Sequence, residues 1–153
     1  MLKRLVKALL PLLMLALLIT GCSSTSPTGA GTTNGGAAQI TEDGTYTTKE
    51  DVSLYLHTYQ KLPSNFITKK EAQKLGWDNK KGNLDKIAKG KSIGGDRFGN
   101  YDKKLPEAKG RTWKECDINY EGGYRGAERI IYSSDGLIYY TDDHYNSFEE
   151  ITF

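Results

Sequence analysis

A single histidine near the end of the chain is the residue best suited to move a proton near neutral pH. His144 lies in the stretch YYTDDHYNSF, residues 139–148, among acids and tyrosines. Imidazole changes its protonation between about pH 5 and 8, so His144 is a candidate general acid, a candidate metal ligand, or a surface residue without a role. A zinc site is not favoured, because the region has one histidine and no paired cysteines.

Four charged residues earlier in the chain could complete an acid–base site: Glu115, Asp117, Arg125 and Arg129. Cleavage of RNA at its own 2′-hydroxyl needs a base for that proton and an acid for the leaving 5′-oxygen, tasks to which Glu and His are suited. Arginines can stabilise the added negative charge of the transition state. This chemistry requires no metal.

The same four residues could instead have a purely structural role. On geometry alone this explanation is as good as the catalytic one. Opposite charges on neighbouring strands form ion-pair lattices, which perturb pKa values as catalytic sites do. The position of Lys69 supports the catalytic explanation, because this residue falls in the first turn of a predicted helix. The helix dipole disfavours a cation there, whereas free backbone N–H groups favour a bound anion.

An antiparallel sheet in the C-terminal part is predicted to position these side chains. Period-two patterns predict strands at residues 111–120, 124–132, 136–141 and 147–153, with turn signals between them. The first hairpin predicts that Glu115 opposes Arg129, on a face shared with Trp113, Asp117, Asn119 and Arg125. The second predicts that Arg129 opposes Tyr140, and a regular strand would then place His144 on the same face. The other face carries Cys116, which we interpret as a small buried hydrophobe.

Helices are predicted to precede the sheet. The capping signals at Thr48 and Thr68 open two helices, and residues 83–88 predict a short third one. His57 flanks the apolar stripe of the first helix and is assigned no chemistry. Residues 91–110, rich in glycine, are predicted to be a long loop. The fold class is therefore α+β, with three short N-terminal helices packed on a C-terminal antiparallel β-sheet.

The chain divides into three predicted regions. Residues 1–21 combine a basic start with an apolar run and small residues, which is typical of a secretory signal. The end of this segment, LITGC, resembles the lipobox of bacterial lipoproteins and implies lipid attachment at Cys22 after cleavage. Residues 22–39 read as a flexible Ser/Thr/Gly tether, and residues 40–153 as the folded domain.

Charge is distributed unevenly along the chain. Of its 21 basic and 19 acidic residues, three basic ones lie in the predicted signal, so the remainder is close to neutral. Residues 69–114 carry 14 basic and 6 acidic side chains, whereas residues 115–153 carry 2 and 9. This asymmetry could steer a polyanion, although a solvated lysine-rich face explains it as well.

Long stretches of the domain closely resemble the extracellular guanyl-preferring ribonucleases of bacilli, the barnase and binase family. The matching stretches are KLPSNFITKKEAQKLGW, KGNLDKIAKGKSIGGD, GRTWKECDINY and RIIYSSDGLIYYTDDHY. The resemblance runs from Tyr55 to Ile151 and implies the same α+β fold. It also implies a metal-independent endoribonuclease without a cofactor, which forms a 2′,3′-cyclic phosphate and hydrolyses it to a 3′-phosphate.

The resemblance implies roles for individual residues. Glu115 falls at the family's general base and His144 at its general acid, with Tyr145 beside it in the site. The phosphate-binding cations of the family correspond to Lys69, Arg125 and Arg129, and its supporting acids to Asp96 and Asp117.

The base-recognition loop departs from the family pattern. The family usually reads F-S-N-R-E there, and this chain reads Phe98, Gly99, Asn100, Tyr101 and Asp102. Asp102 keeps a carboxylate for the guanine edge but is one methylene shorter than Glu. Tyr101 replaces an arginine, so guanine preference is a hypothesis.

The implied partners are RNA, the membrane through a lipid on Cys22, and a small acidic inhibitor of the barstar type. We expect a monomer, exported and either held on the outer face of the bacterial membrane or released. The alternative is a catalytically impaired surface lipoprotein that binds RNA or a protein, for which the altered loop is the support.

Overall fold

The computed structural model describes residues 39–153. The predicted signal peptide, the predicted lipidation site Cys22 and the predicted tether up to residue 38 lie outside the described residues. Among residues 39–153, no helix has the length and apolar character needed to cross a bilayer.

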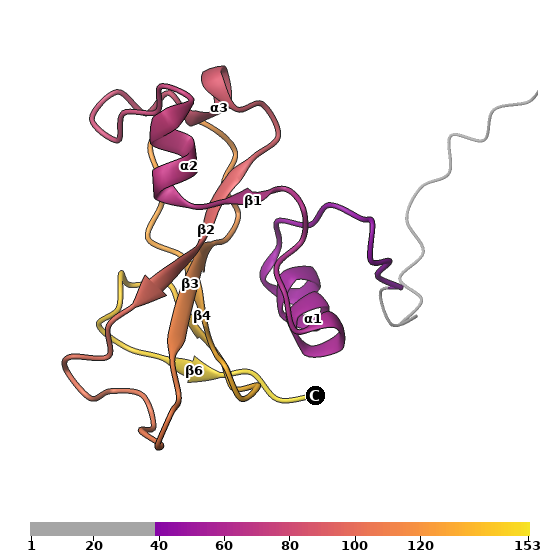
Figure 1. The fold of residues 1–153 in the computed structure, drawn as a ribbon, viewed down its shortest axis with the longest axis vertical. Helices are drawn as coiled ribbons and strands as arrows, with labels where there is room; N and C mark the ends of the chain where they lie inside the picture. The colour runs from indigo at the N-terminus through magenta and orange to yellow at the C-terminus, as the bar shows by residue number, and fades with distance from the viewer. Residues whose placement is uncertain (1–38) are drawn as a thin grey trace, which may run out of the picture. The chain divides into compact units, whose positions relative to one another are not determined.

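One six-stranded sheet, with its strands in sequential order, organises the described part of the chain. The strands are β1 (Phe66–Ile67), β2 (Ser92–Phe98), β3 (Trp113–Asp117), β4 (Arg129–Ser133), β5 (Ile138–Thr141) and β6 (Glu149–Glu150). β1 and β2 are parallel, and the other neighbours are antiparallel. Figure 1 shows α1 beside the sheet, and α2 and α3 together near the beginning of β2.

Three short helices precede most of the sheet, as the sequence predicts. They are α1 (Lys49–Tyr59), α2 (Lys69–Lys74) and α3 (Leu84–Ile87). The Thr48 side chain accepts a hydrogen bond from Asp51 N at the start of α1. Thr68 and Glu71 form a reciprocal capping box at the start of α2, which fixes two otherwise unpaired backbone donors. The α+β fold class is therefore confirmed.

The prediction of one long loop over residues 91–110 is wrong in its first part, where β2 lies. Gly94 and Gly95 interrupt the alternating pattern typical of a strand, so β2 was not recognised in the sequence. Close packing explains why residue 94 is a glycine. A Cβ on Gly94 would come within 2.6 Å of Cys116 Cβ and 2.7 Å of a Phe66 ring carbon. Gly95 has φ +92°, and the pairing with β3 shifts register between Gly94 and Asp96. This local bulge precedes the site residue Asp96.

The predicted register between β3 and β4 is wrong by two residues. Asp117 pairs with Arg129, and Glu115 pairs with Ile131. The connection spans residues 118–128, and Asn119 leaves the strand conformation with φ 55°. Because side chains alternate with a period of two, a two-residue shift leaves Glu115, Asp117 and Arg129 on one face.

The predicted register between β4 and β5 is wrong by one residue, and this error changes faces. Arg129 pairs with Thr141, so Tyr140 lies on the opposite face from the one predicted. The strand ends at Thr141, and both His144 and Tyr145 have positive φ, at 54° and 73°. His144 is therefore positioned by a turn and not by a regular strand.

The side chain of Asp143 builds that turn. Its carboxylate accepts hydrogen bonds from the Thr141 and Ser147 hydroxyls at 2.9 and 2.7 Å. It also accepts the backbone N–H groups of Asn146 and Ser147. The predicted strand at residues 147–153 is correspondingly reduced to β6.

Apolar side chains cover both faces of the sheet. Cys116 is 1% exposed and packs with α1 residues Val52 and Leu56, which confirms its interpretation as a buried hydrophobe. On the face that carries Glu115, Trp113 and Ile131 form a second buried cluster with Leu105 and Tyr139. That face, on which the sequence placed Trp113 with the charged residues, therefore carries an apolar cluster as well as the charged residues.

Candidate active site

Glu115 is a buried carboxylate held by hydrogen bonds from Lys69 and Tyr145. It is only 6% exposed. Lys69 Nζ donates to Oε1 and the Tyr145 hydroxyl donates to Oε2, both at 2.6 Å. Burial acts to raise the pKa of Glu115, but the hydrogen bonds from Lys69 and Tyr145 outweigh it and leave the pKa below its usual value. Glu115 is therefore ionised at neutral pH.

Tyr145 remains a hydrogen-bond donor to this carboxylate. Burial, together with its bond to Glu115, raises the pKa of Tyr145 to about 12. Its ring also stacks on Phe98, with centroids 5.4 Å apart. Lys104 Nζ donates to the carbonyls of Tyr145 and Asn146 at 3.0 and 2.9 Å. These contacts hold the turn that carries Tyr145 against the loop that follows β2.

Asp117 orients the two arginines of the site. Arg125 donates to both its oxygens, from Nε at 2.6 Å and from Nη2 at 2.7 Å. Arg129 Nε lies 2.9 Å from Asp117 Oδ1, although it lacks hydrogen-bond geometry there. Arg129 Nη1 donates to the carbonyls of Gly126 and Glu128. Asp117 therefore holds the Arg125 guanidinium by two hydrogen bonds, whereas an ion pair and two backbone carbonyls hold that of Arg129.

Asp96 supports Lys69 through the backbone. Asp96 Oδ2 accepts the backbone N–H of Lys69 at 2.9 Å. This N–H, at the first residue of α2, is thus occupied and is not the free anion-binding donor that the sequence suggested. The Lys69 ammonium instead faces Glu115, so α2 contributes to the site through this side chain.

His144 lies with the arginines in an open pocket of about 320 Å³. The pocket is lined by Asn79, Arg125, Gly126, Ala127, Arg129 and His144. The His144 ring is 4.7 Å from the Tyr145 ring, centroid to centroid. The turn thus places Tyr145 on Glu115 and His144 in the pocket with the two cations.

The loop after β2 is held in place by an asparagine. Asn100 Nδ2 donates to the Leu105 carbonyl at 2.7 Å, and the Leu105 N–H donates to Asn100 Oδ1 at 3.0 Å. Leu105 is buried, so this pair fixes the loop to the core. The Asn100 amide is consequently occupied by the protein's own backbone.

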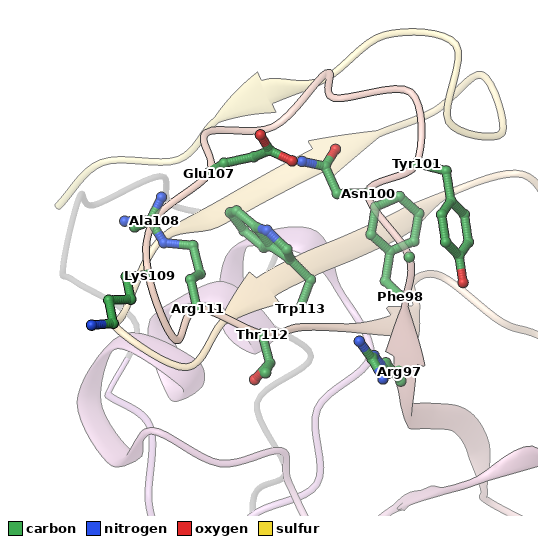
Figure 2. Close-up of a pocket in the computed structure, with 11 residues that line it drawn as sticks. Arg97, Phe98, Asn100, Tyr101, Glu107, Ala108, Lys109, Arg111, Thr112 and Trp113 are labelled. Atoms are coloured by element: carbon green, nitrogen blue, oxygen red, sulfur yellow. The ribbon is translucent and has the colours of Figure 1, made fainter.

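Tyr101 is an exposed large hydrophobic residue of this loop, at 92%. Its ring lies against Gly99, where an added Cβ would collide with it. Residues 97–101 form one side of a pocket of about 520 Å³, with residues 107–113 on the other. Figure 2 shows Tyr101 at one end of this pocket and Lys109 with Arg111 at the other, with Trp113 between them. Neither Glu115 nor His144 lines it.

Comparison with known proteins decides the family. The sequence model of a family described as ribonuclease matches residues 38–152, most of the chain. The chain belongs to the ribonuclease family. A ribonuclease of Bacillus pumilus is 48% identical over 133 residues, covering 84% of this chain and 82% of that protein. A ribonuclease of Heyndrickxia coagulans is 56% identical over 104 residues, covering 68% and 95%. A ribonuclease of Bacillus intermedius has the same identity and length of match, covering 68% and 64%.

Membership of this family makes the chain an RNA-cleaving enzyme, and its charged cluster is the candidate site. The structure brings together Glu115, His144, Tyr145 and the cations Lys69, Arg125 and Arg129, with Asp96 and Asp117 behind them. Residues 39–153 contain no cluster of three or more His, Cys, Asp or Glu side chains arranged as a metal site.

Two residues near this site were not found from the sequence. Asn79 lines the pocket of His144 from the segment after α2, and Lys104 fastens the turn that carries Tyr145. Neither has a local sequence signal, because only the tertiary fold brings them close to the charged cluster.

Proposed function

We propose that this ribonuclease is an endoribonuclease that cleaves single-stranded RNA after guanosine, without a metal. The observation that carries the proposal is the buried carboxylate of Glu115, hydrogen-bonded by Lys69 and Tyr145. It lies beside a pocket in which His144 accompanies two arginines. The groups that the proposed base, acid and phosphate contacts require, a carboxylate, an imidazole and cations, support this reading of the site.

Each proton transfer is assigned to one residue. Glu115 takes the proton of the 2′-hydroxyl, and that oxygen attacks the phosphorus as the bond to the 5′-oxygen breaks. His144 protonates the departing 5′-oxygen, which leaves a 2′,3′-cyclic phosphate. In the second step His144 accepts a proton from water, and Glu115 returns a proton to the 2′-oxygen as the ring opens to a 3′-phosphate.

The cations act on the phosphate between these two groups. Arg125 and Arg129 are oriented by Asp117 before substrate binds, so little reorganisation is needed when negative charge develops. Lys69, whose ammonium contacts Glu115, would serve the same phosphate once it is released from that carboxylate. The loop of residues 98–102 would receive the base, with the Asp102 carboxylate available for the guanine edge.

Digestion of total RNA in EDTA, followed by analysis of the product ends, tests the reaction. We expect 2′,3′-cyclic phosphates first and 3′-phosphates later. Products with 5′-phosphate ends would contradict the mechanism. A protein that binds RNA but yields no products would support the alternative of a catalytically impaired surface protein, which the exposed Tyr101 in the altered loop favours.

Guanine preference is tested separately with dinucleotides. GpN substrates should be cleaved faster than the matched ApN substrates, because Asp102 can accept from the guanine N1–H and 2-amino groups, which adenine lacks. Equal rates would refute the preference without affecting the assignment of the acid and base.

We further propose that the protein is exported, lipidated on Cys22, and active as a monomer, with a barstar-type inhibitor in the producing cell. Labelled palmitate should enter the wild-type protein but not a Cys22→Ala variant. Equal labelling of both proteins would contradict the lipid anchor.

A further inference from the structure

A further pocket, of about 550 Å³, lies on the opposite side of the sheet from Glu115. Side chains alternate along β3, so Lys114, which lines this pocket, shares a face with Cys116 and not with Glu115. The pocket is formed by the end of α1, the beginning of β3 and the hairpin between β4 and β5. None of the proposed catalytic residues lines it.

The inner part of this pocket is apolar. Leu56 and Ile138 line it, and both are buried members of the core cluster that contains Cys116. Gly136 also lines it, and a Cβ added at Gly136 would meet no atom within 4 Å. The space beside the hairpin turn is therefore unfilled. An apolar group placed there would exchange water for contact with hydrophobic side chains.

Three polar side chains that line the pocket are free to bind a ligand. Within residues 39–153 the Lys114 ammonium forms no ion pair or hydrogen bond, and the Gln60 amide forms no hydrogen bond. The His57 imidazole likewise has no hydrogen-bond partner in the described part of the chain. Its ring is held by stacking on Phe153, with centroids 4.4 Å apart.

The charges around the pocket favour an anion. Lys114 is the one lysine or arginine among the lining residues, and Asp135 is the one acid. Arg111 donates to both oxygens of Asp135, from Nε at 2.8 and 2.9 Å and from Nη2 at 2.7 Å. This pairing compensates the charge of Asp135, so the positive charge of Lys114 is left for a ligand.

We infer that this pocket binds a small amphipathic carboxylate, a molecule with one acidic group on an apolar body. The carboxylate pairs with Lys114, and the apolar body lies against Leu56 and Ile138. One cation matches a single negative charge, whereas a bound RNA strand would need several cations along its path. The site is thus separate from the RNA-cleaving centre.

Octanoate is the probe, because it combines a carboxylate with an apolar chain. Titration of octanoate into the full chain, followed by amide chemical shifts in NMR spectra, should give saturable changes at residues 56–60, 112–114 and 132–138. The signals of Arg125 and His144 should not move. Acetate, which lacks the chain, and octanol, which lacks the charge, should each bind more weakly.

Substitution of the lysine tests the charged half of the site. Lys114→Gln should weaken octanoate binding by roughly two- to fivefold, the range for losing one partly exposed ion pair. It should leave octanol binding unchanged. Lys109→Gln is the matched control, because Lys109 is an exposed lysine that lines a different pocket. This control should bind octanoate like the wild type.

A second variant fills the pocket without removing a hydrogen bond. Thr112 lines the pocket, is exposed, and its hydroxyl has no partner within the described residues. Figure 2 shows its side chain directed away from Trp113. Thr112→Phe should therefore reduce the binding of both octanoate and octanol. Circular dichroism and cleavage of GpN by both pocket variants should match the wild type.

Several outcomes would overturn the inference. They are the absence of saturable shifts with octanoate, equal binding of acetate or octanol, and shifts centred on Arg125 and His144. Unchanged octanoate binding by Lys114→Gln would do so as well. Because cleavage is measured separately, a wild type that fails to cleave RNA would overturn the proposed function and leave this pocket as inferred.

Discussion

Glu115 is kept ionised by two partners of different kinds. Tyr145 is a neutral donor, whereas Lys69 is a cation whose side chain is 38% exposed. Burial alone would raise the pKa of the carboxylate, so these contacts decide its protonation state. The Glu115 carboxylate thus depends on α2 for its ionised state and on the turn after β5 for its orientation.

Removal of Lys69 should therefore change the pH dependence as well as the rate. The hydrogen bond and positive charge of Lys69 lower the pKa of Glu115, so Lys69→Ala should raise it. Because Glu115 is proposed to act as the general base, in its ionised form, the acidic limb of the kcat/KM profile for GpN should shift to higher pH. The measurement is a pH–rate profile, with the exposed neighbour Lys70→Ala as the control. A lower rate with an unshifted acidic limb would show that Lys69 acts on the phosphate alone.

Helix starts were predictable from the sequence, and strand registers were not. The caps at Thr48 and Thr68 are local signals, since the residues that form each cap lie within three positions of one another. Register instead depends on loop geometry. The 118–128 connection shifts the pairing of β4 with β3 by two residues, and the side chains stay on the predicted face because they alternate with a period of two. The error of one residue between β4 and β5 instead moves the β5 side chains to the opposite face.

The candidate site shows the same limit. The family resemblance implies the roles of Glu115 and His144 directly. The argument from strand alternation for His144 was wrong, because Arg129 pairs with Thr141 and not with Tyr140. A turn built by Asp143 places the histidine instead. Asn79 had no signal in the sequence, because its neighbours in the pocket come from distant segments.

The loop after β2 should respond to loss of its asparagine clamp. Asn100→Ala removes two hydrogen bonds to Leu105 and leaves a buried backbone N–H and C=O without these partners. We expect a higher KM for GpN, a smaller change in kcat, and a loss of about 1–3 kcal/mol in the free energy of unfolding. Kinetics and denaturant unfolding measure these effects, with Lys103→Ala in the same loop as the control. An unchanged KM would mean that the loop does not hold the base.

Acidic groups across the whole domain set its behaviour at low pH. Hydrogen bonds from Arg111 lower the pKa of Asp135 to about 2, and those from Ser147 lower the pKa of Asp143 to about 2. The pKa of Glu115 is lowered as well. A carboxyl whose pKa is lower in the folded state stabilises the fold above its unfolded pKa, about 4, and loses this contribution as pH falls through the folded value.

The thermal midpoint should therefore fall steadily between about pH 4 and pH 2. Arg111→Ala should flatten part of this fall, because Asp135 would then titrate closer to its ordinary pKa. Differential scanning calorimetry at a series of pH values measures both curves. A midpoint that stays constant down to pH 2 would contradict the role of these carboxylates.

The pairing of Glu115 as base with His144 as acid is tested most directly by cleavage kinetics of GpN dinucleotides in EDTA. Wild type, Glu115→Ala and His144→Ala would be compared at neutral pH, with circular dichroism to confirm that each variant folds. The account predicts that each substitution lowers kcat/KM by orders of magnitude and that the wild type releases a 2′,3′-cyclic phosphate. A folded variant of either residue that cleaves at close to the wild-type rate would contradict it.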